Sequence, residues 1–169
     1  MNYPPEIADE EIASLKLARD IESLKETSGP SRHGWEFRQV SDMHWIVRMF
    51  GTRKNGQRDE YWVKLGAEYY DAAGPTVLFV DPDGKEVKGL SPWLPKLNPR
   101  PNWIAIHPDR NNKVHIGQLV CFSFNAFYEF THSPPDEDLR WKQGVHTVAA
   151  TLYSLQKALG PEHYECRLS

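Results

Sequence analysis

The chain lacks the features that mark several common classes of protein. Its 169 residues include only two cysteines, so no disulfide framework is expected. No apolar run approaches the roughly 18 residues that a membrane-spanning helix needs. The net charge is −3, so the chain has no positive excess with which to bind nucleic-acid phosphates. We therefore expect neither a membrane nor a nucleic acid as a partner.

Length and composition favour one compact domain that covers residues 1–169. A chain of this size with 40% hydrophobic residues buries enough surface to fold without disulfides. Its first five residues do not combine a basic segment with an apolar core, so no secretory signal is predicted and we expect a cytoplasmic location. Prolines and tryptophans are numerous, at 13 and 6, which indicates long, rigid and well-packed loops.

The spacing of apolar residues predicts an α+β fold with a helix near each end. The first helix is expected from Glu6 to Glu26, and Gly29-Pro30 ends it. Its buried stripe is predicted to contain Ile7, Ala13, Leu17, Ile21 and Leu24. Two further apolar residues, Ile12 and Leu15, fall outside this stripe. They are either ordinary exposed residues or a partner surface.

Between the helices, alternating residues predict a four-stranded antiparallel meander. The strands are expected near residues 35–40, 45–50, 60–65 and 75–80, joined by short turns. The segment 85–102 carries four prolines and is expected to lie over the sheet as ordered, irregular structure. A final helix is predicted from Leu139 to Leu159, with Asp138 as its N-cap.

Cys121 is the candidate nucleophile of the chain. It ends an apolar, strand-like stretch and begins a polar loop, and thiolates both attack and leave readily. The alternative is a buried, inert cysteine that packs as a small hydrophobic residue. The other cysteine, Cys166, lies close to the C-terminus, where we expect a mobile tail.

Three histidines, His107, His115 and His132, flank Cys121 in the sequence. Together with the thiol they are residue types that bind zinc, but their spacing matches no tight zinc pattern. A metal site is therefore an alternative to thiol chemistry, and the zinc content of the purified protein distinguishes the two.

The order helix, meander, long loop, single cysteine and helix resembles the ubiquitin-conjugating enzymes over nearly the whole chain. Four local features carry the resemblance, and they are His44–Val47, Ala67–Tyr70 followed by Gly74–Phe79, His107-Pro108-Asp109 and Gly117–Cys121. Asp109 stands where the family has an asparagine that supports the oxyanion, and the segment 85–102 looks like an insertion. These departures are similar to those of divergent bacterial relatives, several of which are linked to anti-phage defence.

This resemblance implies an enzyme that carries a ubiquitin-like modifier as a thioester on Cys121. The modifier would come from an activating-enzyme-like protein and pass to an amine on a target protein, with no cofactor and no metal. With Asp109 in place of the asparagine, the candidates for oxyanion support are Asn112 or its neighbour Asn111, His115 and His107. Asp138, in an acidic cluster after the cysteine, is the candidate for accepting the proton of the incoming amine. A non-catalytic binding module of the same fold remains the other reading.

Overall fold

The computed structural model describes residues 6–111, 116–130 and 140–169 and has the expected α+β class. Its elements are α1 (Glu10–Lys25), α2 (Ser28–His33), β1 (Glu36–Gln39), β2 (His44–Thr52), β3 (Arg58–Gly66), β4 (Thr76–Val80), β5 (Pro95–Leu97), β6 (Ala105–Asn111), β7 (Ile116–Cys121), η1 (Ala126–Phe130), α3 (Val148–Ala158) and β8 (Tyr164–Arg167). The main sheet is antiparallel with the order β1-β2-β3-β4, which confirms the predicted meander. No helix within the described ranges is both long and apolar enough to cross a bilayer.

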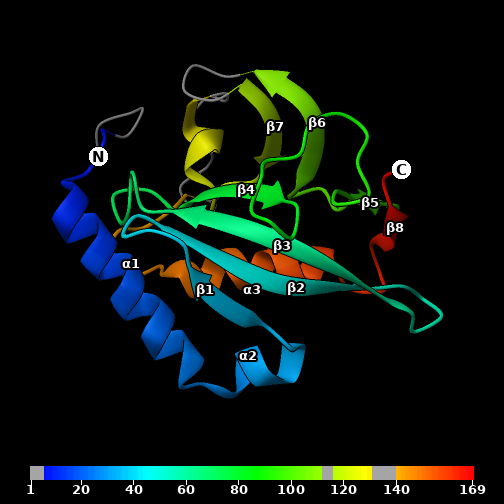
Figure 1. Ribbon diagram of the computed structural model, residues 1–169, viewed down its shortest axis with the longest axis horizontal. Helices are drawn as coiled ribbons and strands as arrows, with labels where there is room; N and C mark the ends of the chain where they lie inside the picture. Colours follow the sequence, from blue (N-terminus) through cyan, green and yellow to red (C-terminus); the bar gives the residue numbers. More distant parts are fainter. Residues whose placement is uncertain (1–5, 112–115, 131–139) are drawn as a thin grey trace.

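The helices and the sheet enclose one main core. Strands β2 and β3 pair over their whole lengths, and inward-facing residues such as Val47 and Val63 stand opposite each other and are fully buried. Leu17 of α1 and Leu152 of α3 belong to the same cluster of buried side chains. In Figure 1, α3 runs along the sheet, α1 lies at one end of it, and the β6–β7 hairpin stands beyond β4. The hairpin is therefore a separate two-stranded layer at the β4 edge.

Helix α1 begins later than the sequence suggested. Asp9 is its N-cap, and the Asp9 side chain accepts a hydrogen bond of 3.0 Å from the backbone nitrogen of Ile12. Ile7 therefore precedes the helix and is 71% exposed, so its predicted place in the buried stripe was wrong. The rest of the stripe is confirmed, because the other four members are at most 5% exposed, and they are Ala13, Leu17, Ile21 and Leu24.

Contrary to the prediction, the Gly29-Pro30 pair does not end the helical region. It lies inside α2, a second short helix that starts at Ser28 after a break at Glu26 and Thr27. Pro30 fits there because the first backbone N–H groups of a helix have no partner within the helix, so the missing N–H costs no hydrogen bond.

The last helix, α3, also begins later than predicted, at Val148 and not near Leu139. Thr147 is its N-cap and accepts a 3.3 Å hydrogen bond from the backbone nitrogen of Ala149. Asp138 is therefore not the cap of this helix, and it lies outside the described residues. The turns before the helix serve to bury Trp141, which is 3% exposed.

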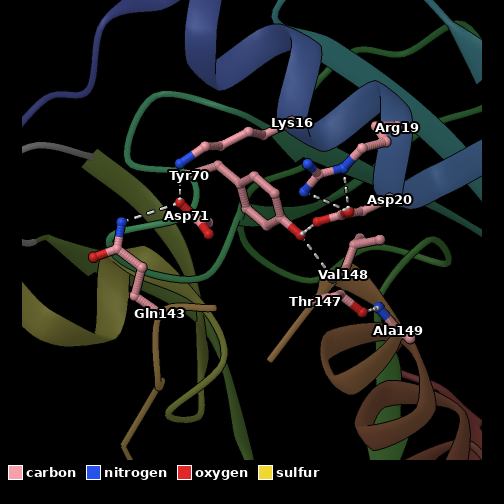
Figure 2. A network of polar contacts seen from close by, with 9 residues as sticks. All are labelled: Lys16, Arg19, Asp20, Tyr70, Asp71, Gln143, Thr147, Val148 and Ala149. Carbon is pink, nitrogen blue, oxygen red and sulfur yellow. Dashed lines mark hydrogen bonds and ion pairs between the residues drawn. The ribbon is translucent and has the colours of Figure 1, made fainter. Parts of the chain in front are cut away.

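A polar network ties both long helices to the turn that follows β3 (Figure 2). The hydroxyl of Tyr70 donates to a carboxylate oxygen of Asp20 on α1 at 2.6 Å, and it accepts from the backbone nitrogen of Val148 on α3 at 3.0 Å. Next to it, Lys16 of α1 forms an ion pair of 2.7 Å with Asp71. The indole nitrogen of Trp141 donates to the backbone oxygen of Asp71 at 2.7 Å. The turn thus fixes where α3 and the segment before it can lie.

Tyr70→Phe is expected to lower the free energy of unfolding by about 2 kcal/mol, because it leaves a buried N–H and a carboxylate without their shared partner. Tyr70 is 1% exposed, so water cannot replace the hydroxyl easily. Urea denaturation of the variant measures the loss. Tyr153→Phe is the matched control, since Tyr153 is 40% exposed. Equal stability of the two variants would contradict the role given to the Tyr70 hydroxyl.

The C-terminal segment is not a mobile tail. Residues 164–167 form β8, which pairs with β5 from the proline-rich segment 85–102, and Cys166 stands opposite Lys96. Tyr164 is buried, and its hydroxyl lies 2.6 Å from the Tyr61 hydroxyl. This pairing was missed because the two strands are short and lie far apart in the sequence.

Candidate functional site

Cys121 lies at the end of β7, where the strand passes into a short loop before η1. Val120 before it and Phe122 after it belong to the main core, whereas Cys121 is only partly buried. Successive residues of a strand point to opposite faces. The thiol therefore points away from the core, on the opposite face of the hairpin, and it is not part of a disulfide with Cys166.

The β6–β7 register brings one predicted site residue to the same face as the thiol. Cys121 pairs with Ala105, and His107 pairs with Leu119. Residues two positions apart on paired strands are diagonal neighbours on one face of a sheet. His107 and Cys121 are related in this way, and a bulge follows His107 before the register resumes at Arg110.

Two buried side-chain amides connect the Cys121 strand to the edge of the main sheet. Gln118 is fully buried, and its carbonyl oxygen accepts from the backbone nitrogen of Phe79 at 2.7 Å. Its amide nitrogen donates to the backbone oxygens of Phe79 and Val87 at 2.6 and 2.8 Å. The Gln118 amide thus pairs with the β4 edge in the way that a neighbouring strand would.

Asn125 does the same on the other side of the cysteine. It is fully buried, its carbonyl oxygen accepts from the backbone nitrogens of Val77 at 3.0 Å and Phe127 at 3.1 Å, and its amide nitrogen donates to the backbone oxygen of Val77 at 3.3 Å. The same nitrogen donates to the backbone oxygen of Val120 at 2.7 Å. Because Val120 directly precedes Cys121, Asn125 fixes the backbone that carries the thiol.

Gly117 is the glycine of the segment that resembles the family motif, and its backbone requires that residue type. Its φ angle is 136°, a conformation that side chains with a Cβ rarely adopt. A Cβ here would also lie 2.6 Å from a carboxylate oxygen of Glu86. The close approach lets the segment after β4 lie against β7.

The electrostatic environment of Cys121 keeps its thiol protonated at neutral pH. Burial raises the pKa of the Cys121 thiol above its ordinary value, and the positive charges of Arg110 and Arg100 oppose this increase without cancelling it. A reactive cysteine usually has a lowered pKa. Chemistry at this thiol therefore requires a proton acceptor or a partner that brings further positive charge.

The thiol reactivity of Cys121 is expected to rise about tenfold for each pH unit between pH 7 and 8.5. The reason is that the thiolate is the reacting form, and below the pKa its fraction grows tenfold per unit. Alkylation of the protein with iodoacetamide, followed by mass mapping of the Cys121 peptide, measures this slope. A rate that is already constant above pH 7 would show a lowered pKa and contradict the burial effect.

Sequence reasoning missed a second titratable group in the loop after Cys121. Glu129 on η1 is 9% exposed, and burial raises the pKa of its carboxyl group, while Arg140 opposes the shift. Burial also raises the pKa of the neighbouring Tyr128, and Cys121 and Glu129 add to that effect. The available signal was the position of Glu129 between two aromatic residues, Tyr128 and Phe130, because a segment rich in aromatic side chains usually packs against the protein.

Asn111 is the last residue of β6 and pairs with Ile116, at the opposite end of β7 from Cys121. The remaining predicted site residues lie outside the part of the chain that the structure describes, and they are Asn112, His115, His132 and Asp138. Their proposed roles therefore stay predictions. Among the residues that the structure describes, no three His, Cys, Asp or Glu side chains gather in a way that could hold a metal ion.

Comparison with known proteins does not assign the chain to a family. No protein-family model matches the sequence, and the search of curated proteins returned no match.

Proposed function

We propose that the protein carries a ubiquitin-like modifier as a thioester on Cys121 and transfers it to an amine of a target protein. The observation that carries the proposal is the setting of the thiol. It is partly exposed, it lies at a strand end, and the strand that carries it is held to the sheet by buried amides of Gln118 and Asn125. A rigidly held nucleophile of this kind suits acyl transfer, which depends on orientation.

In the proposed reaction, the Cys121 sulfur attacks the activated C-terminal carbonyl of the modifier, and the bond to the activating protein breaks. An amine then attacks the thioester, the carbon–sulfur bond breaks, and the thiol is restored. Glu129 joins Asp138 as a candidate acceptor of the amine proton, because a carboxyl group with a raised pKa is a better base. His107 shares the hairpin face of Cys121, which makes it the described candidate for oxyanion support.

The proposal is tested by reconstitution. The protein is mixed with ATP, an activating-enzyme-like protein and a ubiquitin-like modifier, and the products are separated with and without a thiol reductant. A conjugate that disappears on reduction supports the proposal, and its absence with an active activating protein contradicts it.

A non-catalytic binding module is the second candidate, and the raised pKa of the Cys121 thiol favours it. Such a module would bind the modifier without forming a reducible conjugate. Calorimetric binding of the modifier with no thioester product distinguishes this function from the first.

A further inference from the structure

A serine, a histidine and a glutamate form a continuous hydrogen-bonded chain. The chain lies where β2 begins and β3 ends, at the end of these strands opposite the β2–β3 turn. Ser41 lies in the turn that joins β1 to β2, His44 is the first residue of β2, and Glu68 follows β3. The Ser41 hydroxyl oxygen lies 3.0 Å from Nδ1 of His44, and Nε2 of His44 lies 2.6 Å from a carboxylate oxygen of Glu68. Both distances are those of hydrogen bonds.

The contacts of Glu68 favour its ionised form. Burial acts to raise the pKa of Glu68, but hydrogen bonds from His44, from the Glu68 backbone and from Thr76 outweigh burial and hold the pKa below its ordinary value. Glu68 is therefore ionised at neutral pH and accepts the Nε2 proton of His44. In the neutral tautomer that carries this proton on Nε2, the Nδ1 lone pair of His44 accepts the proton of the Ser41 hydroxyl. This is the order of groups that activates a serine nucleophile.

The serine and the histidine also open onto a pocket of about 300 Å³. Val40 and Ile46 give the pocket an apolar wall, and its lining also contains one residue of each charge, Lys64 and Asp83. A volume at the lower end of the range for ligand sites suits a short acyl group. Ser41 is exposed, so a substrate can reach its hydroxyl.

We propose that Ser41, His44 and Glu68 form an acyl-transfer site that hydrolyses small carboxylic esters, separate from Cys121. The Ser41 oxygen attacks the ester carbonyl carbon while its proton moves to Nδ1 of His44. The ester carbon–oxygen bond breaks, and His44 returns the proton to the departing alcohol. Water then attacks the acyl-serine and gives a proton to Nδ1 of His44. The bond between the Ser41 oxygen and the acyl carbon breaks, the carboxylic acid leaves, and His44 returns the proton to the Ser41 oxygen. Lys64 stabilises the negative oxygen of both intermediates, and Glu68 is a positioning residue that orients His44.

The probes are p-nitrophenyl acetate and a fluorophosphonate, which phosphonylates an activated serine with loss of fluoride. All variants carry Cys121→Ser and Cys166→Ser, because thiols also accept acyl groups from activated esters. We expect the fluorophosphonate to modify the Ser41 peptide, as found by mass mapping. We expect Ser41→Ala to abolish this labelling, and Ser41→Ala and His44→Gln to lower ester hydrolysis by about a hundredfold.

Ser31→Ala is the matched control. Ser31 is exposed and its hydroxyl also makes a local hydrogen bond, of 3.2 Å to the backbone oxygen of Ser28, so its removal should leave both readouts unchanged. Thermal melts identify any variant that fails to fold. Fluorophosphonate labelling of Ser41 is measured in the protein that keeps Ser41, His44 and Glu68, so it does not depend on those variants. An unlabelled Ser41, or equal hydrolysis by Ser41→Ala and Ser31→Ala, would overturn the proposal and leave the Ser41–His44 contact as a turn hydrogen bond.

Discussion

Cys121→Ser is expected to form no reducible conjugate, whereas Cys166→Ser is expected to form as much as the wild type. The hydroxyl of serine is a far weaker acid than a thiol, so it supplies almost no anion to attack the modifier at neutral pH. Any ester that forms slowly on the serine would resist thiol reductants. The readout is therefore the amount of conjugate that a reductant removes, compared on non-reducing and reducing gels.

The two variants are matched in chemistry and differ only in place. Both cysteines are partly buried, and each substitution exchanges sulfur for oxygen. Neither change is expected to alter the free energy of unfolding by more than about 1 kcal/mol, because both side chains retain contact with solvent. A reducible conjugate on Cys121→Ser, or its loss only in Cys166→Ser, would move the nucleophile to β8 and end the proposed role of Cys121.

The sheet was predictable because its information is local. Strand β3 alternates buried and partly exposed residues along most of its length, and the four strands pair in chain order, so neighbours in sequence become neighbours in space. The same reasoning failed where distant segments meet. β8 consists of four residues, and it became a strand because β5, about 70 positions earlier, offers it a partner. A pattern of that length carries no signal by itself.

The helix ends show a related limit. The apolar spacing around Ile7 and around Leu139 is compatible with helix, but the polar caps decided the starts at Asp9 and Thr147. The region before α3 was needed to place Trp141, whose indole nitrogen bonds to the backbone at Asp71. Tertiary contacts therefore overrode helical periodicity at this point.

The candidate site was predictable in its nucleophile but not in its support. Cys121 stood out as the one thiol inside an apolar strand pattern, and the structure gives it a partly exposed position at a strand end. The supporting amides were not assigned. Gln118 lies within an apolar strand and Asn125 lies between Phe124 and Ala126, and these are unusual sequence positions for a polar side chain that is exposed on the surface. A lone amide in an apolar run requires internal hydrogen-bond partners, and this rule would have found both.

Asn125→Ala is expected to lower the free energy of unfolding by about 3 kcal/mol or more. The substitution leaves the backbone nitrogen and oxygen of Val77, the nitrogen of Phe127 and the oxygen of Val120 without the partner they share. Each buried group that loses its only partner costs about 1–3 kcal/mol, and partial rearrangement reduces the sum. Urea denaturation measures the loss, and Asn102→Ala is the control because Asn102 is exposed.

Asn125→Asp separates the roles of the two amide atoms. The carboxylate keeps the acceptor for Val77 and Phe127 but faces the backbone oxygen of Val120 with no proton to donate, and it buries a charge. Burial raises the pKa of the introduced carboxyl group in the folded state above its unfolded value. The variant is therefore least stable at pH 7 and regains stability as the pH falls through the raised folded pKa, because the protonated group again donates to an oxygen.

This pH dependence also tests whether Asn125 positions Cys121 or only stabilises the fold. If it holds the thiol, the alkylation rate of Cys121 in the still-folded Asn125→Asp variant differs from that of the wild type, even where a melt shows that both proteins are native. The Gln118 amide bonds to the backbone of Phe79 and Val87 and not to that of Val120, so Gln118→Glu is expected to lose stability in a similar way with a smaller change in Cys121 reactivity. Equal changes in reactivity for the two variants would mean that the amides hold β7 to the sheet without orienting the cysteine.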